Sequence, residues 1–175
     1  MMKSIPVWKQ ELSDGVHAAR LASLYCCAPA ETASEAARYA VVLDGLEKTF
    51  GSHAEAGLYS APGRTEIGGN HTDHQHGRVL AGSVNIDMIA AAAPNDKNQL
   101  RVQSEGYDLC VIDLNDLEAR KEEENTTAAL LRGECAAFTQ RAQSWPVWTF
   151  TSLPTCRRAA VSPLLPPLRC SSASS

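Results

Sequence analysis

The chain has 175 residues, of which 44% are hydrophobic and 21% are charged, and its formal net charge is −4. This length and composition are typical of one soluble globular domain, or of one domain and a tail. The charge is mildly negative and forms no basic stripe, which argues against nucleic acid as a partner. No apolar run reaches about eighteen residues, so no membrane span is expected.

The N-terminal ten residues contain lysines but no apolar block follows them, so the sequence predicts no signal peptide and a cytoplasmic location. None of the six cysteines forms a C-x-x-C pair, and in a reducing compartment they are expected to be free thiols. They are Cys26, Cys27, Cys110, Cys135, Cys156 and Cys170. Cys135 lies among apolar residues, which favours a small core residue over a nucleophile.

Helices are predicted in the first fifty residues. Residues 1–30 have weak periodicity and predict short helices. Residues 32–50 repeat apolar side chains at helical spacing, with Thr32 or Ser34 as the N-cap and Glu35 in the first turn. Gly51 is the predicted C-terminal stop.

Several strands and a second helix are predicted next. Strand patterns occur at residues 56–61, 78–93, 100–104 and 109–114, with Gly82 and Asn85 interrupting the second. Asn125 is the predicted cap of a helix over residues 126–141. Its expected buried residues are Ala129, Leu130, Leu131, Ala136, Ala137 and Phe138. This order predicts an α+β domain with an antiparallel or mixed sheet.

Residues 60–77 read S-A-P-G-R-T-E-I-G-G-N-H-T-D-H-Q-H-G and are too polar to form core. The glycines and the proline allow tight turns and a close approach to a ligand. Arginine, carboxylate, amide and imidazole groups in one short segment suit a polyhydroxylated molecule or a phosphate.

This segment resembles the N-terminal signature of galactokinases, P-G-R-V-N-x-I-G-E-H-T-D-Y-x-x-G, within the superfamily that includes mevalonate and homoserine kinases. The residues that carry the resemblance are Pro62-Gly63-Arg64, Ile67-Gly68, His71-Thr72-Asp73 and Gly77. The H-T-D triplet favours the galactokinase branch, with N-acetylgalactosamine kinase as the nearest alternative. The resemblance extends over residues 40–141 and implies the N-terminal lobe of a two-lobed kinase fold, with residues 1–141 as the domain.

The resemblance also implies a reaction, the ATP-dependent phosphorylation of galactose to galactose 1-phosphate with ATP and Mg²⁺. Arg64 would be catalytic, because its guanidinium would stabilise the charge of the transferring phosphoryl group. Glu66, Asn70, His71 and Asp73 would bind the sugar. Two of these depart from the family, which has asparagine in place of Glu66 and glutamate in place of Asn70. The loop is therefore expected to keep one carboxylate near the sugar but to contact its hydroxyls differently.

A metal site is a second interpretation of the same loop. His71, His74 and His76 with Asp73 are ligand types that suit zinc or nickel. The kinase signature already accounts for His71 and Asp73, so no metal is expected, and His74 and His76 are predicted to be solvated.

The composition changes at residue 142. Residues 142–175 contain no Asp, Glu or Lys, and they hold five of the nine prolines. This composition predicts an irregular tail. The family's phosphate loop, P-x-G-x-G-L-S-S-S-A, is expected in this region and is absent as written.

A shift of reading frame accounts for the tail. If the coding strand is read from the third base of each codon, each new codon begins with the third base of one original codon. Its second and third bases are then the first and second bases of the following original codon. From residue 148, suitable synonymous codons then give D-V-Y-V-T-S-N-V-P-A-G-S-G-L-S-S-S-A-A-F-E-V-L-L-G-V-I, which contains that phosphate loop. The second bases of the new codons are nearly all fixed by the amino-acid sequence. A chance match to the family's phosphate loop over this length is therefore improbable.

Three functional outcomes follow from this sequence. The first is a galactokinase whose printed chain is inactive, because the phosphate loop and the family's C-terminal lobe are not in it. The second is a non-catalytic galactose-binding or regulatory relative, and the third is a non-functional product that is degraded.

Overall fold

The structure is a computed structural model that describes residues 2–52, 55–69, 76–141 and 148–153. Helices and strands both contribute to it, so the predicted α+β class is confirmed. The helices are α1 Ile5–Ser13, α2 Ala18–Tyr25, α3 Ala33–Phe50 and α4 Thr127–Arg141, with short 3₁₀ turns at Pro29–Glu31 and Lys121–Glu123. The strands are β1 Gly57–Gly68, β2 Leu80–Pro94, β3 Gln99–Ser104, β4 Cys110–Asp113 and β5 Trp148–Leu153.

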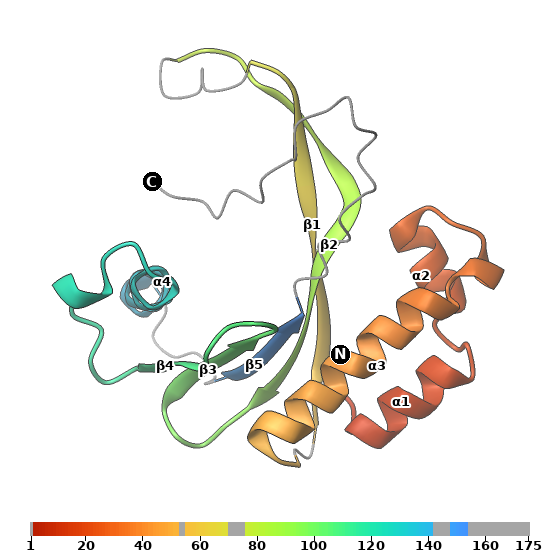
Figure 1. The fold of residues 1–175 in the computed structure, drawn as a ribbon, viewed down its shortest axis with the longest axis horizontal. Helices are drawn as coiled ribbons and strands as arrows, with labels where there is room; N and C mark the ends of the chain where they lie inside the picture. The colour runs from red at the N-terminus through yellow and green to blue at the C-terminus, as the bar shows by residue number, and fades with distance from the viewer. Residues whose placement is uncertain (1, 53–54, 70–75, 142–147, 154–175) are drawn as a thin grey trace.

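The five strands form one mixed sheet in the order β1-β2-β5-β3-β4. All neighbours are antiparallel except β3 and β5, which are parallel. Strands β1 and β2 extend well past the helices as a long curved hairpin (Figure 1). Because β5 lies between β2 and β3, the prediction of irregular structure from residue 142 onward is wrong for residues 148–153.

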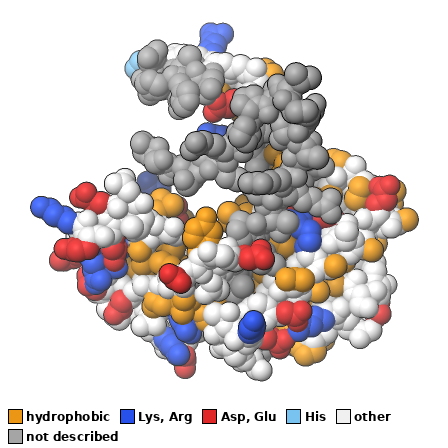
Figure 2. All heavy atoms as spheres, viewed as in Figure 1, with side chains coloured by type: hydrophobic (Ala, Val, Ile, Leu, Met, Phe, Trp, Pro, Cys, Tyr) orange, Lys and Arg blue, Asp and Glu red, His pale blue; other side chains and the backbone are white. Residues whose placement is uncertain are grey.

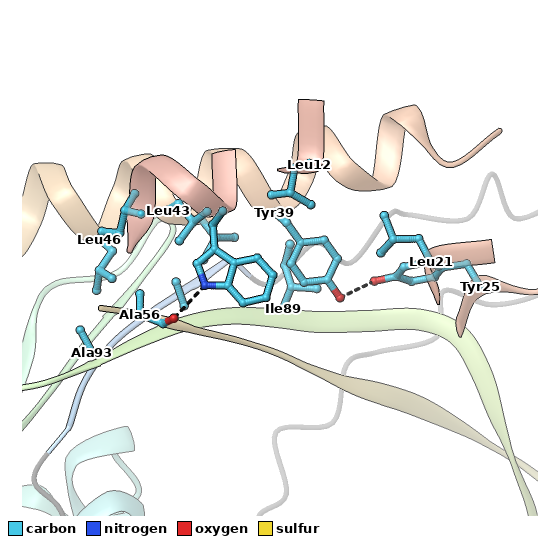
Figure 3. Packing of buried hydrophobic residues seen from close by; sticks show 13 residues of the cluster. Leu12, Leu21, Tyr25, Tyr39, Leu43, Leu46, Ala56, Ile89 and Ala93 are labelled. Carbon is cyan, nitrogen blue, oxygen red and sulfur yellow. Dashed lines mark hydrogen bonds between the residues drawn. The ribbon is translucent and has the colours of Figure 1, made fainter. Parts of the chain in front are cut away.

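Helices α1, α2 and α3 cover one face of the sheet at β1 and β2 (Figure 1). Ile5, Val42, Leu43, Leu46 and Ile89 are almost fully buried in this core. Alternate residues of β2 point toward the helices, as the period of two in a strand requires. The Trp8 indole N–H donates a 2.8 Å hydrogen bond to the Ala56 carbonyl, which joins α1 to the start of the hairpin (Figure 3).

Helix α4 covers the opposite face. The β3 residue Leu100 packs in a cluster with Ile112 of β4 and Cys135 of α4. Its neighbour Arg101 lies instead over the ring of Phe50 in α3. Adjacent residues of a strand point to opposite faces, so α3 and α4 are on different sides of the sheet. Cys135 is only 2% exposed, which confirms its prediction as a core residue.

Several details of α4 differ from the prediction. Leu130, Phe138 and Ala137 are exposed rather than buried. Figure 2 shows hydrophobic side chains gathered over the part of the surface where α4 and β4 lie. The buried polar residue of α4 is Arg132, which donates to both carboxylate oxygens of Glu123 and to the Asp116 carbonyl. Its charge is therefore paired, as a buried guanidinium requires.

The observed helix ends confirm the predicted C-terminal end of α3 but not the predicted side-chain caps at the starts of α3 and α4. Gly51 follows α3 with φ of 83°, the left-handed region that favours glycine. Thr32 precedes α3, but its hydroxyl donates to the Pro29 carbonyl instead of capping the helix. Before α4, the hydroxyl of Thr126 accepts the Ala129 N–H, so Thr126 caps this helix and not Asn125. Among the described residues, none of the helices has the length and apolar character needed to cross a membrane.

Candidate functional site

The first half of the polar signature is a strand. β1 continues to Gly68, although the sequence predicted a strand only to residue 61 and a loop beyond it. The reason is tertiary, because β2 is long enough to pair with β1 as far as Leu80. Gly82 lies within continuous β2, so the predicted interruption there is not observed. The strand half of the signature therefore lies on the part of the β1–β2 hairpin that projects beyond the helices.

The pairing of β1 and β2 changes register twice within the signature. One shift lies between Pro62 and Arg64, and the other between Glu66 and Gly68. Gly63 lies in the first shift, where an added Cβ would come within 3.1 Å of the Ile86 carbonyl oxygen. Such irregularities bend a strand and change the direction of the side chains that follow.

Arg64 and Glu66 lie between these two shifts. The Arg64 side chain is 78% exposed, and one of its guanidinium nitrogens is 3.8 Å from a carboxylate oxygen of Glu66. A pair this long and this exposed contributes little to stability. The structure thus brings together two of the predicted site residues and leaves Arg64 accessible to a ligand.

Among Gly63, Gly68 and Gly69, Gly69 has the strictest backbone requirement. Its φ is +81°, and an added Cβ would lie 2.0 Å from the carbonyl oxygen of Arg78. Gly68 has neither a positive φ nor any atom within 4 Å of an added Cβ. Counted from Pro62, the signature glycine falls on Gly69, so its assignment to Ile67-Gly68 is one residue early.

Three predicted sugar-binding residues, Asn70, His71 and Asp73, lie outside the described residues, and so does His74. His76 is described, and it is exposed with φ of 60°. Within the part of the chain that the structure describes, no group of three or more His, Cys, Asp or Glu side chains is placed to hold a metal ion.

A buried polar cluster that the sequence analysis missed lies at the base of the projecting hairpin. Asp87 of β2 is only 6% exposed. Its carboxylate accepts hydrogen bonds from the Tyr25 hydroxyl at 2.6 Å, the Ser60 hydroxyl at 2.6 Å and the Arg38 guanidinium at 2.7 Å. The Tyr39 hydroxyl lies 3.0 Å from that of Tyr25 (Figure 3). The signal in the sequence was one carboxylate within the apolar run I-D-M-I-A.

These contacts determine the charge states in the cluster. Burial alone would raise the pKa of Asp87, but the hydrogen bonds from Ser60, Tyr25 and Arg38 outweigh it and hold this pKa below its ordinary value. Burial, and then the hydrogen bond to Asp87, raises the pKa of Tyr25. Asp87 is therefore ionised and Tyr25 neutral at neutral pH, with Arg38 as the counter-charge at β2.

The helix N-termini in the described residues do not form a phosphate cradle. Such a cradle needs free backbone N–H groups at the start of a helix, usually after a glycine-rich turn. None of the four described helices follows a glycine-rich turn, because the residues directly before α1, α3 and α4 contain no glycine and those before α2 contain only Gly15. At the start of α4, the Thr126 hydroxyl also accepts the Ala129 N–H group. The described residues therefore contain no phosphate cradle of this kind.

Comparison with known proteins gives a consistent result. The family described as the galactokinase galactose-binding signature matches residues 46–94. The galactokinase of Ligilactobacillus salivarius is 35% identical over 86 residues, which are 47% of this chain and 22% of that protein. The galactokinase of Lacticaseibacillus casei is 33% identical over 66 residues, or 38% of this chain and 17% of that protein.

The fold comparison agrees. The crystal structure of Lactococcus lactis galactokinase complexed with galactose superposes with a TM-score of 0.58 at 19% identity, covering 67% of this chain and 30% of that one. The matched segments span less than a third of the length of these relatives. The chain therefore carries the galactokinase galactose-binding signature on a partial galactokinase fold and is related to the galactokinases over this part of their length.

Proposed function

We propose that the chain is the sugar-binding part of a galactokinase, a phosphotransferase that uses ATP and Mg²⁺ to convert galactose to galactose 1-phosphate. The observation that carries this proposal is the signature at residues 46–94, whose strand half presents Arg64 and Glu66 together on the projecting hairpin. ATP supplies the phosphoryl group in this reaction and Mg²⁺ neutralises its charge. The described residues contribute to the sugar side.

Each candidate residue has a distinct role in this proposal. Arg64 stabilises negative charge on the transferring group, a role supported by its exposed side chain and by the guanidinium's permanent charge and planar set of donors. Glu66, Asn70, His71 and Asp73 hydrogen-bond the sugar hydroxyls. A carboxylate such as that of Glu66 accepts hydrogen bonds from hydroxyl groups, whereas the amide of Asn70 can both donate and accept.

Galactose binding by the 175-residue chain tests the proposal. Isothermal titration with galactose is expected to give saturable binding, and glucose, which differs at one hydroxyl, is expected to bind more weakly. Arg64→Met keeps the length of the side chain and removes its charge, whereas Arg20→Met is the matched control on α2. Because Arg64 is assigned to the phosphoryl group and not to the sugar, both variants should bind galactose as the parent chain does, whereas the affinity for galactose 1-phosphate should fall in Arg64→Met only. Equal binding of galactose and glucose, or of galactose 1-phosphate by both variants, would contradict the proposed site.

The exchanged carboxylate and amide allow a finer test. Glu66→Gln is expected to weaken galactose binding, because one charged acceptor is lost and charge-assisted hydrogen bonds are the stronger ones. Asn70→Glu should change the preference between galactose and N-acetylgalactosamine, because it restores the family's carboxylate. If both variants bind both sugars as the parent chain does, neither residue contacts the sugar.

We further propose that residues from about 142 onward derive from a shifted reading frame, and that the printed polypeptide binds sugar without phosphorylating it. The absence of the phosphate-loop sequence from residues 142–175 supports this proposal. Resequencing the DNA for residues 140–175 and translating its three frames tests it. A continuous frame containing G-L-S-S-S would support an active galactokinase, and its absence from all frames would favour a galactose-binding regulator.

A further inference from the structure

The register of β1 on β2 is weakly specified by side-chain size at the start of the hairpin. Three consecutive alanines of β2, Ala90, Ala91 and Ala92, pair with residues 59, 58 and 57 of β1. Small side chains of one kind discriminate poorly between alternative registers. A slip of one residue would nevertheless turn every later β1 side chain to the other face of the sheet.

Asp87 supplies the discrimination that the alanines lack. It pairs directly with Pro62 and accepts a 2.6 Å hydrogen bond from Ser60, two residues earlier in β1. The helices hold its other contacts, through Tyr25 and Arg38. In a slipped register the Ser60 hydroxyl would leave the buried carboxylate, and a buried acceptor without its donor is unfavourable. Asp87 thus favours one register of β1 relative to both β2 and the helices.

This anchor lies immediately before the irregularity that precedes Arg64. Pro62 and Asp87 form the last regular pair, and the register shift begins at the next residue of β1. We propose that Asp87 is a positioning residue, which fixes the register of β1 at Ser60 and thereby the face of the hairpin on which Arg64 and the proposed sugar ligand Glu66 lie. Its link to sugar binding rests on the function proposed above.

Two kinds of variant test this proposal in the 175-residue chain. Asp87→Asn removes the charge at the anchor, and Glu123→Gln is the matched control, because Glu123 is also a carboxylate paired with an arginine, but its partner is Arg132 of α4. Both changes should lower stability in urea. Only Asp87→Asn should weaken galactose binding, by about tenfold or more, which corresponds to about 1.4 kcal/mol. Equal loss of affinity in both variants would overturn the proposal, because a merely structural role predicts that result.

Ser60 gives a milder variant that keeps the test decisive if Asp87→Asn does not fold. Ser60→Ala should weaken galactose binding, and Ser60→Thr should restore it by returning the hydroxyl. Combined with Asp87→Asn, Ser60→Ala should add little further loss, because the two residues act through one hydrogen bond. Full additivity, or no rescue by threonine, would count against the anchor.

Strand register itself is a readout that does not require sugar binding. In nuclear magnetic resonance spectra of the parent chain, cross-strand contacts should link Ala61 with Met88 and Ser60 with Ile89. Ser60→Ala should weaken these contacts or add a second set, while Glu123→Gln should leave them unchanged. If the parent chain binds no galactose, the proposed function fails, and these spectra still decide whether Asp87 and Ser60 fix the register.

Discussion

Gly69→Ala tests the requirement for glycine at the end of β1. Gly69 has φ of +81°, and alanine in this left-handed conformation is disfavoured by about 1–2 kcal/mol. The added Cβ would also lie 2.0 Å from the Arg78 carbonyl oxygen, so these atoms must separate by about 1.4 Å to reach the 3.4 Å of an ordinary contact. That displacement lies next to the last β1–β2 pair, Gly68 with Leu80.

The expected loss combines both effects. Losing one or two backbone hydrogen bonds at this end of the hairpin adds about 1 kcal/mol each. Gly69→Ala should therefore lower the free energy of unfolding by about 2–4 kcal/mol, unless the end of the hairpin opens locally first. In that case the free energy of local opening falls instead, and amide hydrogen exchange near Leu80 should become correspondingly faster. Galactose affinity should fall with it, because Gly69 directly precedes Asn70.

Two glycines serve as controls in urea unfolding followed by circular dichroism. Gly68→Ala has open space and no positive φ, so its change should stay within about 1 kcal/mol. Gly15 has φ of +70° with no atom within 4 Å of an added Cβ, so Gly15→Ala should show only the free-energy cost of a positive φ for alanine. Gly69→Ala should exceed both. If unfolding and amide exchange were the same in Gly69→Ala and Gly68→Ala, the close approach to Arg78 would be refuted.

The remaining predictions concern the core and its charges. Leu46→Ala should lower the free energy of unfolding by about 2–5 kcal/mol in urea, because Leu46 is fully buried, and a loss below about 1 kcal/mol would contradict its packing. Trp8→Phe should lower it by at least the roughly 0.5–1.5 kcal/mol of a hydrogen bond, and no change would argue against the bond to Ala56. The pKa of Asp87 is lowered in the folded chain, so its stabilisation is complete above its ordinary value of 3.8 and is lost as pH falls through the lower folded value. Asp87→Asn should therefore lose less stability than the parent chain between about pH 6 and about pH 3 in urea titrations, and equal losses would show that Asp87 does not contribute.

The sequence was sufficient for the elements whose patterns are local. Helix α3, with Gly51 at its end, follows from apolar spacing, and β3 and β4 follow from short alternating segments. The signature at residues 60–77 also pointed to the galactokinases without any structure, because it is a contiguous set of unusual residues. Asn70, His71 and Asp73 were assigned in this way and stay predictions.

Other features were decided by contacts between segments that are distant in the chain. The signature becomes a strand as far as Gly68 because β2 pairs with it, and β5 takes its place in the sheet by pairing with β2 and β3. Phe138 has the right spacing for a buried face of α4, but it is exposed because α4 presents Cys135 and Arg132 to its neighbours. A single helix pattern does not state which side a partner will cover.

Asp87 shows most clearly which features the sequence determines and which depend on tertiary structure. The sequence by itself determined that an acidic residue interrupts an apolar strand, and that it would need partners if it were buried. Only the tertiary structure decided those partners, because Tyr25, Arg38 and Ser60 come from α2, α3 and β1 and are 62, 49 and 27 residues away along the chain. Hydrogen bonds across such separations depend on how the helices and strands pack, which no local pattern of residues encodes.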